Sequence, residues 1–236
     1  MLFRSKNYLG TFYVPNNMTA VVVGDVSAKD AIAEMKRLTR GWKPSPDVDE
    51  RLVKVEIQPS GGVKGFELEK DVQMSYVMMA FRTSGYRDLN ENAVLDICSS
   101  VLGEGQSSRL YRRLVEKEQL VSSVQAFIYP LKYSGLFVIF ATMDPDKVRP
   151  FKAAVLEEVG RLSTEPLPES ELRKVKTMLK ADFQFSNETD SNIAYTLGHF
   201  NILGMLDVAT EYERTIEAVT VEDRKSTRLN SSHRIR

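Results

Sequence analysis

Apolar residues recur along the chain with two different periods. Where they alternate with polar residues or form short β-branched runs, the pattern predicts strands. Such stretches are MTAVVVGDV (residues 18–26), the alternation around Phe66 and Leu68, YVMMAF (76–81), SSVQAFIY (122–129) and GLFVIFATM (135–143). We expect YVMMAF to be a fully buried strand, because it is apolar throughout.

Elsewhere apolar residues recur every three or four positions, which predicts amphipathic helices. Ser27 is expected to cap the first helix, and Pro168 suits a first helical turn because proline lacks an N–H that would need a partner there. Helices are expected over 28–38, 90–102, 107–120, 144–162 and 168–183, and in a final stretch through Ile193, Leu197 and Ile202.

The order of these elements predicts the fold class. A short connection, Pro130 to Ser134, joins the strands at 122–129 and 135–143, which indicates an antiparallel hairpin. Most helices follow the strands and need a sheet face to cover. The sequence therefore predicts an α+β fold, a two-layer sandwich of a mainly antiparallel sheet with helices packed on one face.

Composition changes along the chain and indicates its domain organisation. Residues 45–61 combine prolines, charges and a glycine pair, which is typical of an extended linker. We expect 1–44 to be the C-terminal piece of a truncated first domain and 62–222 to be a complete second domain of similar fold. Residues 223–233 resemble the translated read-through of a sequencing adapter, so we expect 223–236 to be a non-native tail.

Charge and composition exclude some classes of function. The chain has 32 basic and 32 acidic residues. Without the five basic and one acidic residues of the tail, 27 basic and 31 acidic residues leave a net charge of −4. No overall positive field favours nucleic acid, and no apolar run approaches the roughly 20 residues of a membrane span. The single cysteine, Cys98, is expected to be a buried small hydrophobe. The sequence assigns no compartment.

Candidate metal chemistry is sparse. Of the two histidines, His233 lies in the expected tail, and His199 has neither a second histidine nor a cysteine or an H-x-x-E-H neighbour. Zinc sites need three or four protein ligands. We therefore expect no metal-binding, cofactor-binding or catalytic residue in the chain, and a packed or capping role for His199.

The segment around residues 102–120 contains polar residues that could suggest other sites. Ser107 and Ser108 follow glycines, but no strand or lysine accompanies them, so a turn and a helix cap are favoured over a phosphate cradle. Arg109, Arg112 and Arg113 stand at helical spacings from Glu116 and Glu118. A solvated ion-pair face is favoured there over anion binding.

Several segments in a fixed order resemble a known family. They are YVPNNMTAVVVGDVS, the proline-rich linker, MMAFRTSGYRD, LGEGQSSRLYRRLVEKEQL and DPDKV. Together they resemble the C-terminal part of the insulinase/pitrilysin family of inverzincin zinc peptidases, which includes mitochondrial processing peptidase. The resemblance covers about Tyr8 to Glu222.

The resemblance implies two similar α+β domains, of which the first binds zinc on an inverted H-x-x-E-H helix. That motif would lie upstream of Met1. The second domain closes the substrate chamber, and in some members it supplies an arginine and a tyrosine that grip the substrate. The aligned positions are Val115 and Ser122. A valine cannot donate a hydrogen bond, and a serine hydroxyl does not reach as far as a tyrosine phenol.

Three interpretations follow. The favoured one is the C-terminal half of a zinc endopeptidase subunit, which is not catalytic by itself. Its expected partners are a peptide or small-protein substrate, the N-terminal zinc-binding domain and a homologous second subunit, with no nucleic acid and no membrane span. The second interpretation is a non-catalytic structural or partner subunit of the same fold, and the third is a ligand-binding α+β module. The coding sequence upstream of Met1 distinguishes them.

Overall fold

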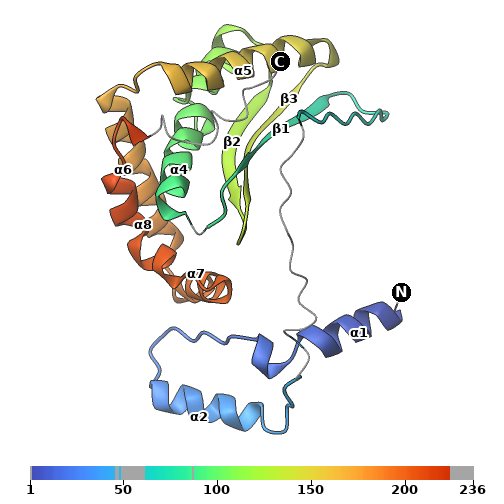
Figure 1. Ribbon diagram of the computed structural model, residues 1–236, viewed down its shortest axis with the longest axis vertical. Helices are drawn as coiled ribbons and strands as arrows, with labels where there is room; N and C mark the ends of the chain where they lie inside the picture. Colours follow the sequence, from blue (N-terminus) through green and yellow to red (C-terminus); the bar gives the residue numbers. More distant parts are fainter. Residues whose placement is uncertain (1, 46–47, 49–61, 87, 224–236) are drawn as a thin grey trace. The chain divides into compact units, whose positions relative to one another are not determined.

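The computed structural model describes residues 2–45, 48, 62–86 and 88–223 (Figure 1). These residues divide into two compact units. The first unit holds the described residues up to 48 together with Gln184–Thr210, and the second holds those from 62 to Phe183 and from Glu211 onward. Most of the expected linker and residues 224–236 lie outside the described residues. The predicted domain boundaries and the predicted non-native tail therefore stay predictions.

The second unit is built on a three-stranded antiparallel sheet. Its strands are β1 (Ser75–Thr83), β2 (Ser123–Pro130) and β3 (Gly135–Met143), in the order β1-β3-β2. Ile139 of β3 lies opposite Met79 of β1 and Ala126 of β2. The predicted hairpin of β2 and β3 is confirmed.

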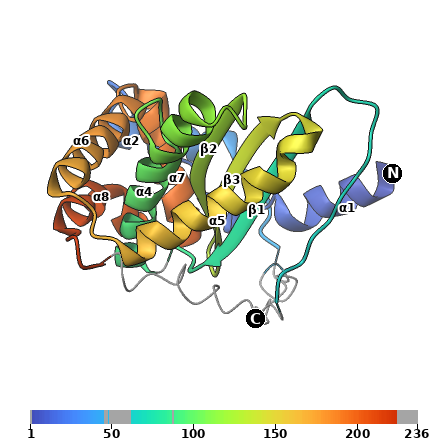
Figure 2. The same cartoon turned by 90° about the horizontal axis from the view of Figure 1, so that it is seen from above.

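Helices cover one face of this sheet (Figures 1 and 2). The main ones are α4 (Leu89–Gly103) and α5 (Val148–Thr164), and their buried residues form one core cluster with the inward side chains of β2 and β3. Gly103 lets α4 approach β2 closely, because a Cβ there would lie 2.2 Å from the backbone nitrogen of Ala126. The predicted α+β sandwich with helices on one face is confirmed.

Further helical segments complete the second unit. The π-helix η2 (Tyr111–Lys117) lies between α4 and β2, and the short 3-10 helix η3 (Pro145–Lys147) leads from β3 into α5. Helices α6 (Glu169–Ser186) and α8 (Leu206–Ala218) follow, and each runs across the boundary between the units. Cys98 is buried in α4, as predicted. No helix in the described ranges has both the length and the hydropathy needed to cross a bilayer.

The first unit contains α1 (Leu2–Phe12), the short 3-10 helix η1 (Pro15–Asn17), α2 (Ala28–Leu38) and α7 (Asp190–Leu203). The Ser27 side chain accepts a hydrogen bond from the backbone N–H of Asp30, so the predicted cap of α2 is confirmed. The sequence pattern predicts no helix at α1, and the structure adds it. Neither α2 nor α7 has a fully buried residue.

Two strand predictions and one burial prediction are wrong. MTAVVVGDV makes no β-ladder hydrogen bonds to another strand, and Phe66 (91% exposed) and Leu68 also lie outside any strand. A strand needs a neighbour to satisfy its backbone groups, and the described residues place none beside these segments. YVMMAF is a strand but is not buried on both faces, since Tyr76 and Met78 point outward and are exposed.

A polar contact ties α8 to α4 within the second unit. The Tyr212 hydroxyl donates a hydrogen bond of 3.2 Å to Oδ2 of Asp96, and the Tyr212 ring packs on Phe183 with 4.7 Å between ring centroids. Burial raises the pKa of Asp96 to about 7, the hydrogen bond from Tyr212 lowers it in part, and the nearby Glu104 raises it. Asp96 in the folded protein is therefore mainly protonated below about pH 7.

This environment makes stability depend on pH in a defined direction. The pKa of Asp96 is raised on folding, so the folded state gains stability as the pH falls from about 7 toward the ordinary value of 3.8, and it loses that stability as the pH rises through the same range. Urea unfolding of the wild type should give a free energy of unfolding about 2–3 kcal/mol higher near pH 5 than near pH 8, and Asp96→Asn should lack this difference.

Tyr212→Phe is the matched control for this pH dependence. It removes the hydrogen bond that lowers the pKa of Asp96, so it should steepen the dependence. Identical pH profiles for the wild type and Asp96→Asn would contradict the assignment.

Candidate functional site

The segment that carries Val115 and Ser122 is a π-helix followed by a tight turn into β2. Leu114 is fully buried and anchors η2, while Val115 is half-buried and packs against the core cluster. The Glu118 N–H donates to the carbonyl of Arg113, five residues back, at 2.8 Å. A π-helix is uncommon and often marks a functional segment.

The turn after η2 is organised by a single carbonyl. The backbone oxygen of Leu114 accepts from the N–H groups of Leu120 at 2.8 Å and Val121 at 3.3 Å. Gln119 has φ +51°, a left-handed conformation that costs roughly 1 kcal/mol for a residue with a side chain. These contacts determine where the chain enters β2.

Ser122 is held against the neighbouring strand. Its N–H and its hydroxyl both donate to the carbonyl of Thr142, at 2.8 Å and 2.9 Å. The hydroxyl is therefore used within the fold, and Val115 has no polar group to offer. In this geometry neither side chain presents a donor to a substrate carbonyl.

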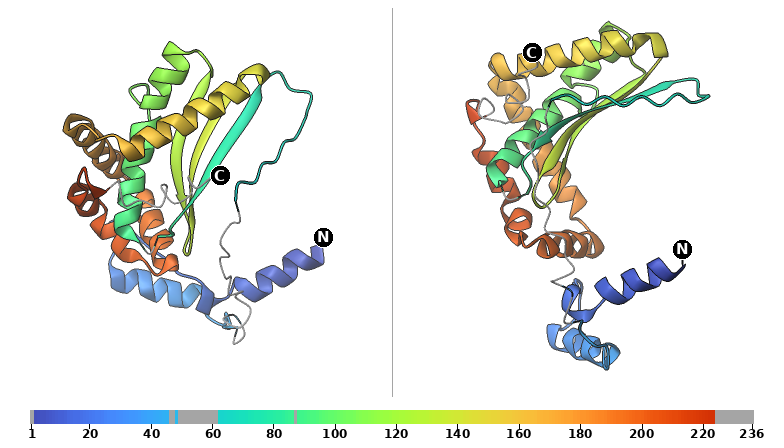
Figure 3. Two further views of the ribbon diagram at one scale, coloured as in Figure 1. Left: turned by 45° about the horizontal axis from the view of Figure 1, so that its top comes forward. Right: turned by 45° about the vertical axis from the view of Figure 1, so that its right-hand side comes forward.

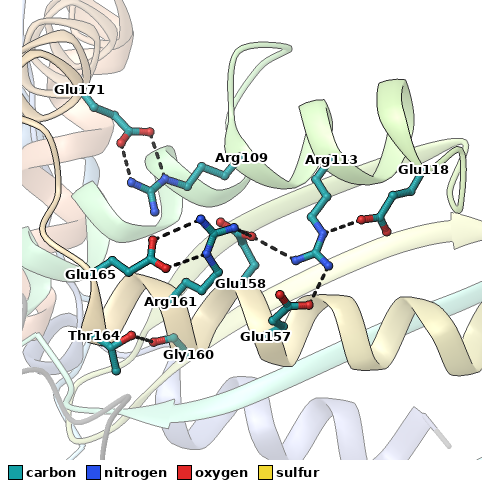
Figure 4. A network of polar contacts seen from close by, with 10 residues as sticks. All are labelled: Arg109, Arg113, Glu118, Glu157, Glu158, Gly160, Arg161, Thr164, Glu165 and Glu171. Carbon is teal, nitrogen blue, oxygen red and sulfur yellow. Dashed lines mark hydrogen bonds and ion pairs between the residues drawn. The ribbon is translucent and has the colours of Figure 1, made fainter.

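A network of ion pairs fixes η2 to the helices behind it (Figure 4). Arg113 bonds Glu118 at 2.7 Å, Glu157 at 2.7 Å and Glu158 at 3.3 Å. Glu158 is buried in α5 and also lies 3.5 Å from Arg161. Arg109 makes a two-pronged contact with Glu171 of α6, at 3.2 Å and 2.6 Å.

The network differs from the solvated helix face that the sequence predicts. The pair between Arg113 and Glu118 is as expected, but the other carboxylates come from α5 and α6, and the Arg113 side chain is 22% exposed. Glu157 and then Glu118 raise the pKa of Arg113 above its ordinary value, while Arg113 lowers the pKa of Glu157. Helical spacing could not find Glu171, because it lies 62 positions from Arg109.

The remaining candidates lie elsewhere. The ring of His199 is exposed on α7 and stacks on Tyr195, with 6.0 Å between centroids. Ser108 is buried and donates to the carbonyl of Gly105 at 2.7 Å, while Ser107 accepts from Lys174. Across the part of the chain that the structure describes, no three histidine, cysteine or acidic side chains group as a metal site would require.

Comparisons with known proteins give a consistent picture. The family described as "Peptidase M16 inactive domain" matches residues 4–179. A Helicobacter pylori protein named Zinc protease PqqE is 25% identical over 223 residues, covering 92% of this chain and 49% of that protein. A probable mitochondrial-processing peptidase subunit beta of Arabidopsis thaliana is 22% identical, covering 82% of this chain and 38% of that protein. The chain spans about half the length, or less, of these relatives.

Solved structures share the fold. A protease from Helicobacter pylori matches with a TM-score of 0.73 and 22% identity, over 89% of this chain and 51% of that one. The structure titled as a peptidase M16 inactive domain from Pseudomonas fluorescens matches with a TM-score of 0.74 and 21% identity, over 86% and 48%. The α+β fold therefore also occurs in these proteins.

Because of the ion-pair network, we expect the loss of Arg113 to lower the free energy of unfolding more than the loss of an exposed arginine does. Arg113→Met would remove the shorter of the two ion pairs that the buried Glu158 makes with arginines in the described structure, and would leave the contact of 3.5 Å to Arg161. We expect a loss of about 2 kcal/mol in the free energy of unfolding, measured in urea, because an uncompensated buried charge is costly.

Arg37→Met is the matched control for the network. Arg37 pairs with Glu34 on the exposed surface of α2, so its loss should change stability by less than about 0.5 kcal/mol. Equal losses of stability from the two substitutions would show that the ion pairs of the buried Glu158 contribute no more than an exposed ion pair does.

Proposed function

Because the chain belongs to the family of peptidase M16 inactive domains, we propose that it is the C-terminal, non-zinc-binding half of a zinc-dependent endopeptidase subunit. The observation that carries this proposal is the family match over residues 4–179, together with relatives named zinc proteases that are about twice as long. In this proposal the chain closes the substrate chamber and helps to hold peptides.

The chemistry of the described residues supports a role without catalysis. A catalytic zinc takes three protein ligands and a water. His199 stacks on Tyr195, and no group of three ligands occurs among the described residues, so the side chains present do not fit a zinc site. We therefore place the zinc of the intact protein upstream of Met1 and assign no step of hydrolysis to this chain.

The first unit supports the proposed domain organisation. We propose that residues 1–44 are the end of a preceding peptidase-like domain, joined through 45–61 to the domain at 62–222. Helix α2 is amphipathic in sequence, yet Ile32 and Leu38 are exposed. Such a helix normally packs its apolar side against a further layer. The proposed preceding domain would supply that layer.

The site around η2 supports a complex in which a second subunit supplies donors that this chain lacks. We propose that Val115 and Ser122 occupy the positions where other members carry a substrate-gripping arginine and tyrosine. Val115 has no donor, and the Ser122 hydroxyl donates to Thr142. A homologous second subunit would then supply the missing donors.

A second candidate function is a non-catalytic structural or partner subunit of the same fold. The lack of free donors at Val115 and Ser122 also favours this function, because a subunit that has lost both donors could also have lost its catalytic role. The two functions differ in whether an H-x-x-E-H motif precedes the chain.

The first experiment measures metal and activity. The 236-residue chain after dialysis should hold no stoichiometric zinc by atomic absorption and should cleave no quenched fluorescent peptide. The complete protein should bind one zinc per chain and cleave. Tight zinc in the 236-residue chain that His199→Ala removes, or a complete protein without zinc or activity, would count against the proposal.

The second experiment tests the partner subunit. The complete protein is assayed alone and then with a co-encoded homologue that carries arginine and tyrosine at the positions of Val115 and Ser122. Donors to a developing negative charge are worth about 10²–10³ in rate each, so adding the homologue should raise kcat by at least about 10². A homologue with both donors replaced by alanine is the control. Full activity of the single chain, unchanged by the homologue, would contradict the prediction.

A further inference from the structure

One face of the sheet in the second unit is apolar and exposed. Helices α4 and α5 lie on the same side of the sheet (Figure 3). Strand residues alternate between the two faces, so each strand has one set of four residues on the face away from these helices. The outward residues are Tyr76, Met78, Ala80 and Arg82 on β1, Leu136, Val138, Phe140 and Thr142 on β3, and Ser123, Gln125, Phe127 and Tyr129 on β2. Met78 is 63% exposed, and Tyr76 and Tyr129 are similarly open.

The strand register orders these side chains into rows. Met78 lies opposite Phe140, and Ala80 and Phe127 both lie opposite Val138. The ring of Tyr76 stacks on Phe140 with 6.4 Å between centroids. Val138 is buried although it belongs to the outward set, and it is not part of the main core cluster. The middle of the face is thus a packed apolar surface.

Charge is confined to the end of the face. Arg82 is the only charged residue among the twelve outward positions of the three described strands, and it lies in the last row, opposite Leu136. Contiguous apolar surface of this kind on a folded protein usually marks a binding site. We therefore expect this face to bind a ligand whose central part is uncharged.

The size of the face selects the kind of partner. Strands about 4.8 Å apart and rows about 7 Å apart give three columns and four rows an area of roughly 300–400 Å². A stable interface between two proteins buries about 800 Å² on each partner, so a second copy of this chain would find too little surface here. An extended peptide fits, because its own side chains on one face also recur about every 7 Å.

We propose that this outward face of β1, β3 and β2 binds an extended, uncharged peptide segment with aliphatic or aromatic side chains at alternate positions. The inference rests on the proposed peptide-holding function and names the class of segment that this half of the subunit would hold. Apolar side chains of the segment would pack over the central rows, around Met78, Phe140 and Phe127.

The test is direct binding to the 236-residue chain, without zinc or cleavage. The probe is a fluorescein-labelled peptide of about nine residues, matched to four rows, with leucine or phenylalanine alternating with serine. A second peptide has glutamate in place of the apolar residues. Fluorescence anisotropy should show that the apolar peptide binds. The dissociation constant of the charged peptide should be at least about tenfold higher.

Substitutions on the face identify the site. Met78→Lys and Phe127→Lys should each weaken binding of the apolar peptide by about tenfold, because each places a charge beneath an apolar contact. Leu38→Lys is the matched control, since Leu38 on α2 has the same exposed fraction as Met78, 63%. Leu38→Lys should leave binding unchanged, and thermal unfolding checks that all variants are folded.

The alternative outcomes separate the binding site from the proposed function. Absence of binding to the wild type, or binding that Met78→Lys and Phe127→Lys leave unchanged, would overturn it. A dimer in sedimentation that Met78→Lys dissociates would assign the face to a second copy. Peptide binding at this face with no peptidase activity in the complete protein would instead overturn the proposed function and leave the binding site standing.

Discussion

Strand β3 is the element on which the second unit depends, because in the described structure it alone has a hydrogen-bonded neighbour on each side. Its inward residues, Phe137, Ile139, Ala141 and Met143, are almost completely buried beneath the helices. A strand held in this way cannot shift its register by one residue without exchanging its two faces. The same constraint therefore creates both the packed core and the open apolar face.

The ion-pair network links α5 to η2 and to the turn before β2. Glu158 on α5 is buried and receives Arg113 from η2, so the position of the π-helix follows from the position of α5. The Leu114 carbonyl then sets the turn, and the Thr142 carbonyl of β3 receives Ser122. Ser122 is therefore positioned by hydrogen bonds to β3, and Val115 by packing against the core.

Under the proposed function, these features would serve to hold a polypeptide. Its described residues offer a firm sheet, an apolar surface with little charge and no cluster of metal ligands. Hydrolysis of a peptide bond by a zinc peptidase needs a metal-bound water and donors for the developing negative charge. Membership of the M16 inactive-domain family is consistent with placing those groups on another part of the assembly.

Local sequence patterns determined most of the second unit. The periods of α4, α5 and α6, the hairpin of β2 and β3, and the burial of Cys98 all follow from side chains a few positions apart, and the α+β class follows from their order. Segment resemblance indicated the family. Tertiary structure alone decided that MTAVVVGDV and the segment around Phe66 form no ladder, that YVMMAF keeps one face open, and that Arg109 pairs with Glu171. These outcomes depend on which distant segments become neighbours, and a residue's own surroundings in the chain do not encode that.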